Sequence, residues 1–257
     1  MGLDVLRARA LALRSPRALR RLAGSLEGDS RQGAGRLALH CLRRAWDLES
    51  EARRFSRLLR LRARLAADGA LVVAGVDEVG VGPLAGPVVA AAVVLPERPH
   101  LPGLDDSKRL SRAVRERLAA GIEAQADDWA VAEVWVEEID RRNIYQAALL
   151  AMQRAVEGLT RRPDHVLVDA RRIPGISVPQ TPLVGGDGRD ASIAAASVVA
   201  KVHRDRIMQR LDGDFPGYGF AKHMGYGTRE HLRALRRLGA TPVHRRSFAP
   251  VAQLPLF

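Results

Sequence analysis

The sequence contains a single cysteine, Cys41, so no disulfide can form within the chain and no multi-cysteine zinc site can be built. This cysteine content suits a reducing compartment, and we expect a cytoplasmic protein. No stretch approaches the roughly 20 consecutive apolar residues that a membrane span needs. Charged residues such as Asp4 and Arg7 also interrupt the first apolar stretch, which predicts that it is not a secretory signal. We therefore expect neither a disulfide-stabilised secreted protein nor a membrane-spanning one.

Lysine is absent from residues 1–70, although these residues include 16 arginines and seven acidic residues. Their net charge of +9 (16 − 7) accounts for most of the +12 of the whole chain, and the composition changes near Gly69. Leucine and alanine recur here at helical spacing, with interruptions at Ser15-Pro16 and around Gly28. We expect a basic helical extension over residues 1–69. Nucleic acid is the first candidate partner and an acidic membrane surface the second, while a merely solvated arginine-rich face is the alternative.

The pattern after residue 69 alternates between strands and helices. Apolar runs at 71–77 and 88–95 predict two strands, and the glycine- and proline-rich connection between them suits an antiparallel pair. Two further strands are predicted at 129–136 and 165–169. Helices are predicted at 111–126, 137–159, 191–211 and 228–238, with Ser111 and Thr228 as N-caps. This order predicts an α/β domain at 70–251 whose mixed sheet is flanked by helices, followed by a tail at 252–257.

Acidic residues stand where the predicted strands end. Asp77 and Glu78 follow one apolar strand, Asp169 ends another, and Asp187 comes just before a helix that begins near Asp190. Because adjacent side chains of a strand point to opposite faces, Asp77 and Glu78 can face one ligand only if the strand ends or bulges there. Solvated acids at an ordinary strand end are the alternative to a binding site.

These four carboxylates come from three segments that can meet at one edge of a sheet, where they would repel one another unless cations neutralised them. Oxygen ligands without paired histidines or cysteines favour Mg²⁺ or Mn²⁺ over zinc. Two such ions can stabilise the attacking and leaving oxygens of a phosphodiester, and a basic surface suits a nucleic-acid substrate. Together these features indicate a nuclease. A dinucleotide-binding oxidoreductase is the weaker alternative, because Gly80, Gly82 and Gly86 miss the required spacing.

An ordered series of motifs extends this reading over about residues 72–251, and through it the chain resembles the bacterial type 2 ribonucleases H (ribonuclease HII). The motifs are Ala74-Gly75-Val76-Asp77-Glu78-Val79-Gly80, Gly82-Pro83-Leu84-Ala85-Gly86-Pro87, Asp106-Ser107-Lys108, Val166-Leu167-Val168-Asp169, Gly186-Asp187, Ser192-Ile193-Ala194-Ala195-Ala196-Ser197, Ala200-Lys201-Val202, Tyr218-Gly219-Phe220-Ala221-Lys222-His223, Gly225-Tyr226-Gly227-Thr228 and His244-Arg245-Arg246-Ser247-Phe248-Ala249-Pro250.

The resemblance implies a ribonuclease H-like fold and metal-dependent endonucleolytic hydrolysis of RNA. Its implied substrates are RNA/DNA hybrids and duplex DNA with embedded ribonucleotides, cut to leave 3′-hydroxyl and 5′-phosphate ends, with a role in ribonucleotide removal and genome maintenance. The family's metal ligands fall on Asp77, Glu78, Asp169 and Asp187, which hold divalent Mg or Mn, two ions during catalysis. We expect the protein to act as a monomer. Asp205 is interpreted instead as the ion-pair partner of Lys201, four residues earlier on one helix.

The resemblance also implies substrate contacts. In the family the turn at Gly80-Val81-Gly82 recognises the ribose 2′-hydroxyl through backbone groups, and Tyr226 matches an aromatic residue that packs on a sugar. This sequence departs from the family at Val81, where arginine is usual, which puts junction preference in question. Ser107 and Lys108 belong to a substrate-binding motif. Lys201, Lys222 and Arg245 are further candidate phosphate contacts, and His223 is assigned no metal role.

The last five residues resemble the short peptide by which bacterial replication and repair proteins bind the sliding clamp. The predicted clamp contacts are Gln253, Leu254, Leu256 and Phe257, with leucine and phenylalanine as anchors for an apolar pocket. The alternative is an apolar tail that packs on its own domain. For the whole chain, the alternative to the nuclease is a non-catalytic module that binds RNA/DNA hybrids or the clamp.

Overall fold

The computed structural model describes residues 2–253, and the chain divides into two compact units with the boundary between Arg57 and Leu58. The first unit consists of α1 (Leu3–Ala12), α2 (Pro16–Gly24) and most of α3 (Ala34–Leu58). Leucines and alanines of these helices form its core, in which Cys41 is fully buried. The predicted interruption at Ser15-Pro16 is confirmed, since α1 ends at Ala12 and α2 begins at Pro16. Ser15 caps α2 and proline occupies its first position. No helix among residues 2–253 is both long and apolar enough to cross a bilayer.

The second unit begins with α4 (Arg60–Ala67), which lies before the predicted boundary at residue 69. Leu61 and Leu65 of α4 pack on the start of the sheet, and the Arg62 guanidinium donates hydrogen bonds to the carbonyls of Leu95 and Pro96 at 2.6 Å each. Helix α4 is therefore fastened to the sheet unit by both apolar packing and hydrogen bonds.

The sheet has five strands in the order β3-β2-β1-β4-β5. They are β1 (Val73–Val79), β2 (Val88–Val94), β3 (Asp128–Val134), β4 (His165–Asp169) and β5 (Gln180–Leu183). Strands β1 and β2 form the predicted antiparallel pair, while β4 runs parallel to β1. This mixed sheet flanked by helices confirms the predicted fold class. Strand β5, which the sequence analysis missed, is short, lies at the sheet edge and contains Pro182.

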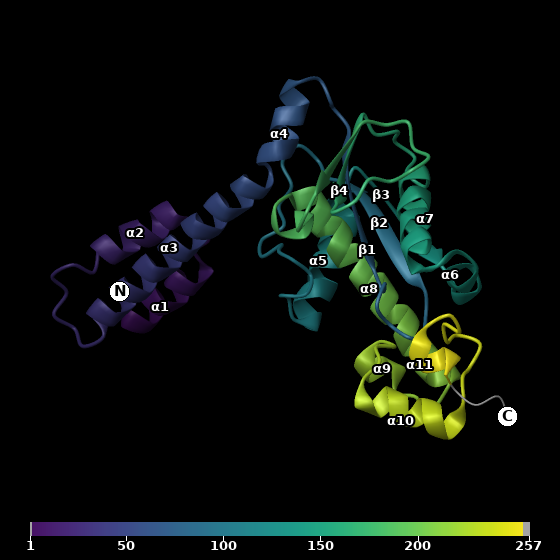
Figure 1. Ribbon diagram of the computed structural model, residues 1–257. Helices are drawn as coiled ribbons and strands as arrows, with labels where there is room; N and C mark the ends of the chain where they lie inside the picture. The colour runs from purple at the N-terminus through teal and green to yellow at the C-terminus, as the bar shows by residue number, and fades with distance from the viewer. Residues whose placement is uncertain (1, 254–257) are drawn as a thin grey trace. The chain divides into compact units, whose positions relative to one another are not determined.

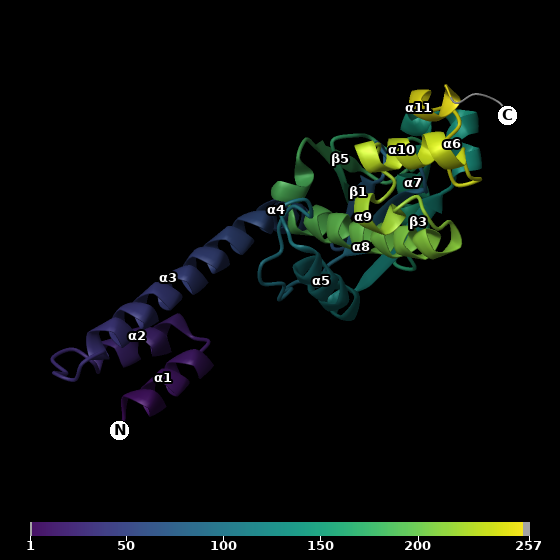
Figure 2. The ribbon, with the colours of Figure 1, turned by 90° about the horizontal axis from the view of Figure 1, so that it is seen from below.

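Helices cover both faces of the sheet (Figures 1 and 2). The long α8 (Ala191–Asp214) packs on β1 and β2, and α7 (Ile144–Glu157) packs on β1, β2 and β3. The other helices are α5 (Arg112–Gln125), α6 (Val136–Arg142), α9 (Phe220–His223), α10 (Arg229–Leu238) and α11 (Ala249–Ala252). The caps Ser111 and Thr228 are confirmed, since each accepts a backbone N–H of its helix.

The predicted single helix at 137–159 is wrong, because α6 and α7 are separated at Asn143. This residue has φ +80° and its side chain caps α7 by accepting the N–H of Gln146. A left-handed backbone conformation cannot continue a helix, and asparagine tolerates it better than most residues do. After this break, α7 packs on β1, β2 and β3.

Candidate active site

Three acidic segments meet at one edge of the sheet. Asp77 and Glu78 lie near the end of β1, and Asp169 is the last residue of β4. Since β1 and β4 are parallel and Val76 is paired with Val168, Asp77 and Asp169 are next in register on neighbouring strands. Asp187 lies in a short 3₁₀ turn, η1 (Gly186–Gly188), that precedes α8. The structure thus brings together the segments that carry the four predicted acids.

Backbone hydrogen bonds fix the turn that carries Asp187. The N–H of Gly186 donates to Oδ1 of Asp169 at 2.7 Å, which fastens the turn to the end of β4. At its other end, the N–H of Asp190 donates to the carbonyl of Gly186 at 2.8 Å. The Asp190 carboxylate in turn caps α8 through the N–H of Ser192 and of Ile193. The position of Asp187 is therefore set by β4 and α8 together.

Asp77 and Glu78 point to opposite faces of the sheet, because the β1–β2 register continues unbroken to the pair Val79 and Val89. The strand neither ends before the two acids nor bulges there. Both carboxylates nevertheless lie near the end of β4, since the pKa of each is raised by burial and, in addition, by the charge of Asp169. Asp77 is 5% exposed and is hydrogen-bonded to Ser197 of α8. Glu78 lies 3.4 Å from Nη1 of Arg171, an ion pair that the sequence analysis missed.

Ser107 occupies a supporting position behind Asp77. Its side chain is buried, and its hydroxyl lies 2.9 Å from that of Ser197, the residue that bonds Asp77. Lys108, the next residue, is 83% exposed in its side chain, and its Nζ lies 4.0 Å from Oδ2 of Asp187. The two residues of this motif therefore differ in role: the serine faces inward to position an acid, whereas the lysine stands at the open edge of the site.

Burial and mutual repulsion destabilise the ionised forms of these acids. Burial, followed by the charge of Glu78, raises the pKa of Asp77 well above its ordinary range. Burial also raises the pKa of Glu78, against the opposing charge of Arg171. The pKa of Asp187 is raised by burial and by the neighbouring carboxylate of Asp106. A divalent cation would relieve all three effects, because it stabilises the ionised forms.

The site suits a hard divalent ion, although its acids do not form a closed cage. Among residues 2–253, no three or more histidine, cysteine, aspartate or glutamate side chains are grouped as a ready metal site. Within the same part of the chain, Oε2 of Glu78 is buried without a hydrogen-bond partner. Mg²⁺ commonly binds one or two carboxylates and completes its shell with water and substrate phosphate. The donor chemistry therefore fits Mg²⁺ or Mn²⁺ bound together with a substrate.

The glycine turn after β1 lies beside Tyr226. A Cβ built on Gly82 would be 3.6 Å from Cε1 of Tyr226, and Tyr226 is 43% exposed. Val81 is half-buried and packs against the sheet–α7 core. Gly80 has φ +90°, and a Cβ there would overlap the Arg204 side chain. The turn is thus open at Gly82 and closely packed at Gly80.

Two buried arginines hold this turn from inside the protein. Arg245 donates hydrogen bonds to the carbonyls of Gly80, Val81 and Gly86 at 2.6–3.1 Å, and it is fully buried. Its prediction as a phosphate contact is wrong, since its guanidinium has no access to a ligand. Arg204, which the sequence analysis missed, donates to the carbonyls of Pro87, Ala85 and Met224. These bonds satisfy carbonyls that would otherwise be buried unpaired.

The other candidate cations are paired with acids. Lys201 lies 2.5 Å from Asp205, which confirms the predicted ion pair on α8. Lys222 is exposed and lies 2.9 Å from Glu230. Of Lys108, Lys201 and Lys222, it is therefore Lys108 that lies beside one of the four acids, Asp187.

A family model described as ribonuclease HII matches residues 74–251 of this chain. Ribonuclease HII of Anaeromyxobacter sp. (strain Fw109-5) is 53% identical over 229 residues, which cover 89% of this chain and 73% of that protein. The crystal structure of ribonuclease H2 from Pyrococcus horikoshii OT3 has a TM-score of 0.62 at 26% identity, covering 71% of this chain and 96% of that one. Ribonuclease HII of Archaeoglobus fulgidus, solved in complex with PCNA, has a TM-score of 0.59 at 27% identity, covering 68% and 94%.

Proposed function

Because this chain belongs to the ribonuclease HII family and is an RNase H endonuclease, we propose that it cleaves RNA in RNA/DNA hybrids and cuts duplex DNA at single embedded ribonucleotides. The observation that carries this proposal is the meeting of three acidic segments at one sheet edge, in a unit whose glycine turn lies beside an exposed tyrosine. Cleavage on the 5′ side of the ribonucleotide leaves 3′-hydroxyl and 5′-phosphate ends. Such an activity serves ribonucleotide removal from the genome.

The proposed chemistry assigns a task to each part of the acidic edge. Asp77, Glu78, Asp169 and Asp187 would hold Mg or Mn, with two ions proposed for catalysis. When bound, the metal supplies Lewis-acid stabilisation of phosphate charge and a water of lowered pKa. Ser197 keeps Asp77 in place, with Ser107 behind it. Lys108 offers a mobile positive charge to a phosphate at the open edge.

Substrate selection is proposed to depend on the glycine turn and on Tyr226. Gly80 makes room for the Arg204 side chain behind the turn, whereas the exposed Gly82 allows the backbone to approach a ribose closely. The ribose 2′-hydroxyl can both donate and accept hydrogen bonds. Tyr226 would pack its exposed ring on the neighbouring sugar. Val81 contributes only its backbone, since its side chain packs inward against the core.

We expect the protein, supplied with Mg²⁺ or Mn²⁺, to cleave both a continuous RNA/DNA hybrid and a DNA duplex with one ribonucleotide. In the second duplex the cut is expected 5′ to the ribonucleotide. Val81→Arg is expected to lower KM for that duplex about tenfold or more, since a charge-assisted hydrogen bond contributes roughly 1.5–3 kcal/mol. Gel analysis of end-labelled duplexes measures both the position of the cut and the change in KM. Cleavage of the hybrid alone would show that junction recognition is lost, and no cleavage of either would favour the non-catalytic binding module.

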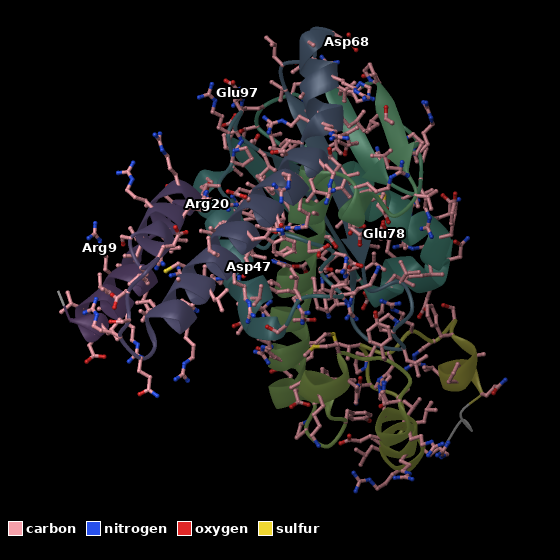
Figure 3. The ribbon with its side chains drawn as sticks, turned by 90° about the vertical axis from the view of Figure 1, so that its left-hand side faces the viewer. Arg9, Arg20, Asp47, Asp68, Glu78 and Glu97 are labelled. Atoms are coloured by element: carbon pink, nitrogen blue, oxygen red, sulfur yellow. The ribbon has the colours of Figure 1, made fainter. Side chains whose placement is uncertain are left out.

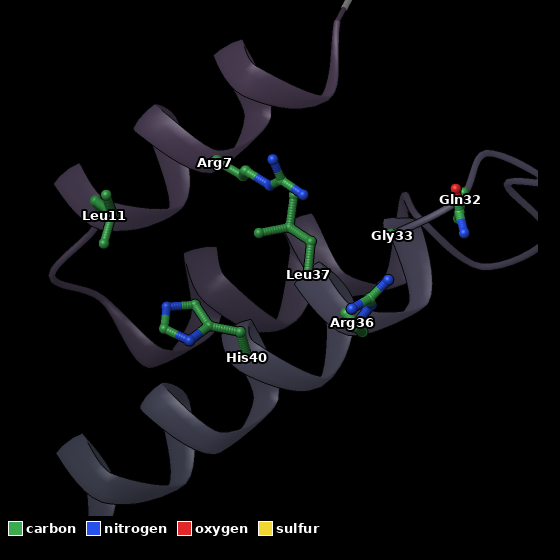
Figure 4. Close-up of a pocket in the computed structure, with 7 residues that line it drawn as sticks. All are labelled: Arg7, Leu11, Gln32, Gly33, Arg36, Leu37 and His40. Atoms are coloured by element: carbon green, nitrogen blue, oxygen red, sulfur yellow. The ribbon is translucent and has the colours of Figure 1, made fainter.

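The first unit, up to Arg57, is proposed to bind the duplex backbone. Arg9 of α1 is exposed to solvent (Figure 3), whereas the exposed Arg20 of α2 is paired with Glu49 at 2.8 Å. Arg7, Arg36 and His40 line a pocket between α1 and α3 (Figure 4). Clustered guanidinium groups of this kind suit phosphate groups.

Deleting residues 1–57 is expected to weaken duplex binding and to flatten its salt dependence. Each phosphate contact that is lost lowers the slope of log K against log salt by about one. The cut is placed before α4, because that helix is fastened to the sheet. Fluorescence anisotropy with a labelled hybrid across a salt series measures the slope. Equal slopes for the full-length and shortened proteins would show that the unit does not contact the duplex.

The C-terminal tail is proposed to bind a bacterial sliding clamp. Gln253 is exposed directly after α11, whereas Leu254, Leu256 and Phe257 lie outside the described residues. Ribonuclease HII of Archaeoglobus fulgidus has been solved in complex with PCNA, which supports a clamp as the partner. A peptide of residues 248–257 that does not bind a bacterial clamp would contradict this proposal.

A further inference from the structure

Three histidines lie beneath the segment that carries Tyr226, and the proposed chemistry uses none of them. They are His223 on α9, His231 on α10 and His244 just before Arg245. His231 and His244 are at most 1% exposed, and His223 is 9% exposed. Buried rings of this polarity need a partner at each nitrogen.

The hydrogen bonds determine which nitrogen of His231 and of His244 carries its proton. Nδ1 of His231 lies 2.9 Å from the carbonyl oxygen of Tyr226, so it must donate, and its Nε2 is left as an acceptor. Nδ1 of His244 accepts the N–H of Thr241 at 3.0 Å, so its proton is on Nε2. That proton points to Nε2 of His231, 3.1 Å away.

His223 completes the network by the same reasoning. Its Nε2 lies 2.9 Å from the carbonyl oxygen of Tyr218 and must donate, while its Nδ1 accepts the N–H of Gly225 at 3.3 Å. The ring also stacks on that of His231, with centroids 4.5 Å apart. Every ring nitrogen of the three histidines therefore has a partner of matching polarity when all three rings are neutral. Nδ1 of His244 has two, since the Thr241 hydroxyl also lies 2.8 Å from it.

Two of these hydrogen bonds are made to Gly225 and Tyr226, consecutive residues of the segment that lies beside Gly82. His223 holds the N–H of Gly225 and His231 holds the carbonyl of Tyr226. The carbonyl of Gly225 in turn accepts the N–H of Leu84 at 2.8 Å, which joins this segment to the glycine turn. The neutral network is thus connected through backbone bonds to the place where Tyr226 meets Gly82.

We propose that His223, His231 and His244 are positioning residues, which as one neutral network hold Tyr226 against the Gly80–Gly82 turn and so determine how tightly the ribonucleotide is bound. The inference rests on the proposed contact between Tyr226 and substrate. A proton added to any ring would place two donors face to face, or would occupy the nitrogen that accepts a backbone N–H. Acid is therefore expected to loosen the turn.

The surroundings of His231 and His244 favour their neutral forms. Burial lowers the pKa of His231, and burial together with His231 lowers the pKa of His244 to about 4. The buried guanidinium groups of Arg204 and Arg245 contact Met224 and the glycine turn. The one carboxylate that faces the network among the described residues is Glu230, near His223, and it is paired with Lys222.

The protonation pattern can be tested directly by ¹⁵N NMR of histidine-labelled protein. His231 is expected as the Nδ1–H form, and His223 and His244 as the Nε2–H forms, at pH 7.5. The chain has seven histidines, so single substitutions assign each ring. An Nε2–H or a charged His231 ring would overturn the proposed network without any reference to substrate.

Two nearly isosteric substitutions then test the positioning role. In His231→Asn, the side-chain NH₂ group takes the place of Nδ1 and can still donate to the carbonyl of Tyr226. In His231→Gln, the NH₂ group takes the place of Nε2, so this hydrogen bond is lost. We expect His231→Gln to raise KM for the single-ribonucleotide duplex about fivefold to tenfold, with kcat changed less than about twofold. His231→Asn should restore most of the loss. His203→Gln, at a half-buried histidine of α8 that contacts Glu133, is the control and should leave KM unchanged.

Tyr226→Ala separates the inference from the proposed function. If Tyr226→Ala raises KM but His231→Gln does not, the positioning role is overturned while the tyrosine contact stands. If Tyr226→Ala leaves KM unchanged, the proposed tyrosine contact itself is overturned, and the positioning role falls with it. Equal KM values for folded His231→Gln and His231→Asn also overturn the role, and thermal melts establish that both variants are folded.

Discussion

Replacing Asp77 by asparagine is expected to abolish cleavage and, at the same time, to stabilise the metal-free protein. Asp77 is nearly fully buried beside other carboxylates, so in the absence of a cation its charge opposes folding. Asparagine has the same shape, and its carbonyl oxygen can keep the bond that the Asp77 carboxylate accepts from the N–H of Glu78 at 2.8 Å. We expect kcat to fall by roughly 10²–10³-fold or more, as on removal of a single electrostatic stabiliser. Duplex binding should be largely retained.

The stability effect has a defined pH dependence. The folded-state pKa of Asp77 lies above its unfolded value, so the folded protein binds more protons and is favoured at low pH. This contribution is lost as the pH rises from the ordinary aspartate pKa of about 4 through the raised folded-state value. Metal-free wild-type protein should therefore lose stability with rising pH over that window. The loss should be smaller in Asp77→Asn, and Mg²⁺ should reduce it in the wild type.

Thermal melts with and without Mg²⁺, run beside cleavage assays, measure both effects. At neutral pH the melting temperature of metal-free Asp77→Asn should rise by about 2–4 °C for each kcal/mol of repulsion removed. Asp214→Asn, at an exposed aspartate that ends α8, is the matched control and should change neither property. Cleavage retained in both Asp77→Asn and Asp169→Asn would refute the metal-site assignment. A melting temperature equal to that of the wild type would refute the repulsion.

The second large effect is expected from Gly75→Ala, which touches no acidic side chain. Gly75 lies in β1, two residues before Asp77, where α8 begins on the same face of the sheet. A Cβ on Gly75 would overlap the backbone carbon of Ser192 and the backbone nitrogen of Ile193. Backbone atoms cannot move aside as a flexible side chain can, so strand and helix must separate. We expect a loss of roughly 3–5 kcal/mol in unfolding free energy.

Separation of β1 from α8 should also reduce activity, because α8 positions both Asp187 and Ser197. Chemical denaturation and cleavage rates of the remaining folded protein measure the two losses. Gly213→Ala is the control on the same helix, since a Cβ there meets nothing within 4 Å. It should stabilise the protein slightly, by about 0.5–1 kcal/mol. A Gly75→Ala protein as stable as the wild type would show that the strand and helix are not so closely packed.

Local sequence patterns were sufficient to predict most of the sheet unit. Apolar runs such as the one before Asp169 are strands because their β-branched side chains suit a buried sheet, and their ends are where polar residues begin. Ser111 and Thr228 were predictable as caps because a side-chain oxygen at that position satisfies a free N–H. The predicted acidic edge followed from the same local rule, since it needed only the ends of strands and the start of one helix.

The tertiary structure decided the features that depend on residues far apart in the chain. Arg245 looks like a surface cation in the sequence, yet it is buried on the carbonyls of a turn some 160 residues earlier. Similarly, Ser107 in a substrate-like motif faces inward, because its partner Ser197 comes from α8. A hydrogen bond or a burial cost depends on which groups meet in space, and nothing in the local pattern of either residue states its partner.

The acidic pair itself shows both kinds of determination. From the sequence alone, Asp77 and Glu78 were placed at the end of an apolar strand and predicted to belong to one site. Only the folded sheet, with its unbroken register, decided that the two side chains lie on opposite faces, one bonded to Ser197 and the other paired with Arg171. Side-chain type and spacing are local properties of a chain, whereas the partners of a carboxylate are set by the segments that pack against its face of the sheet.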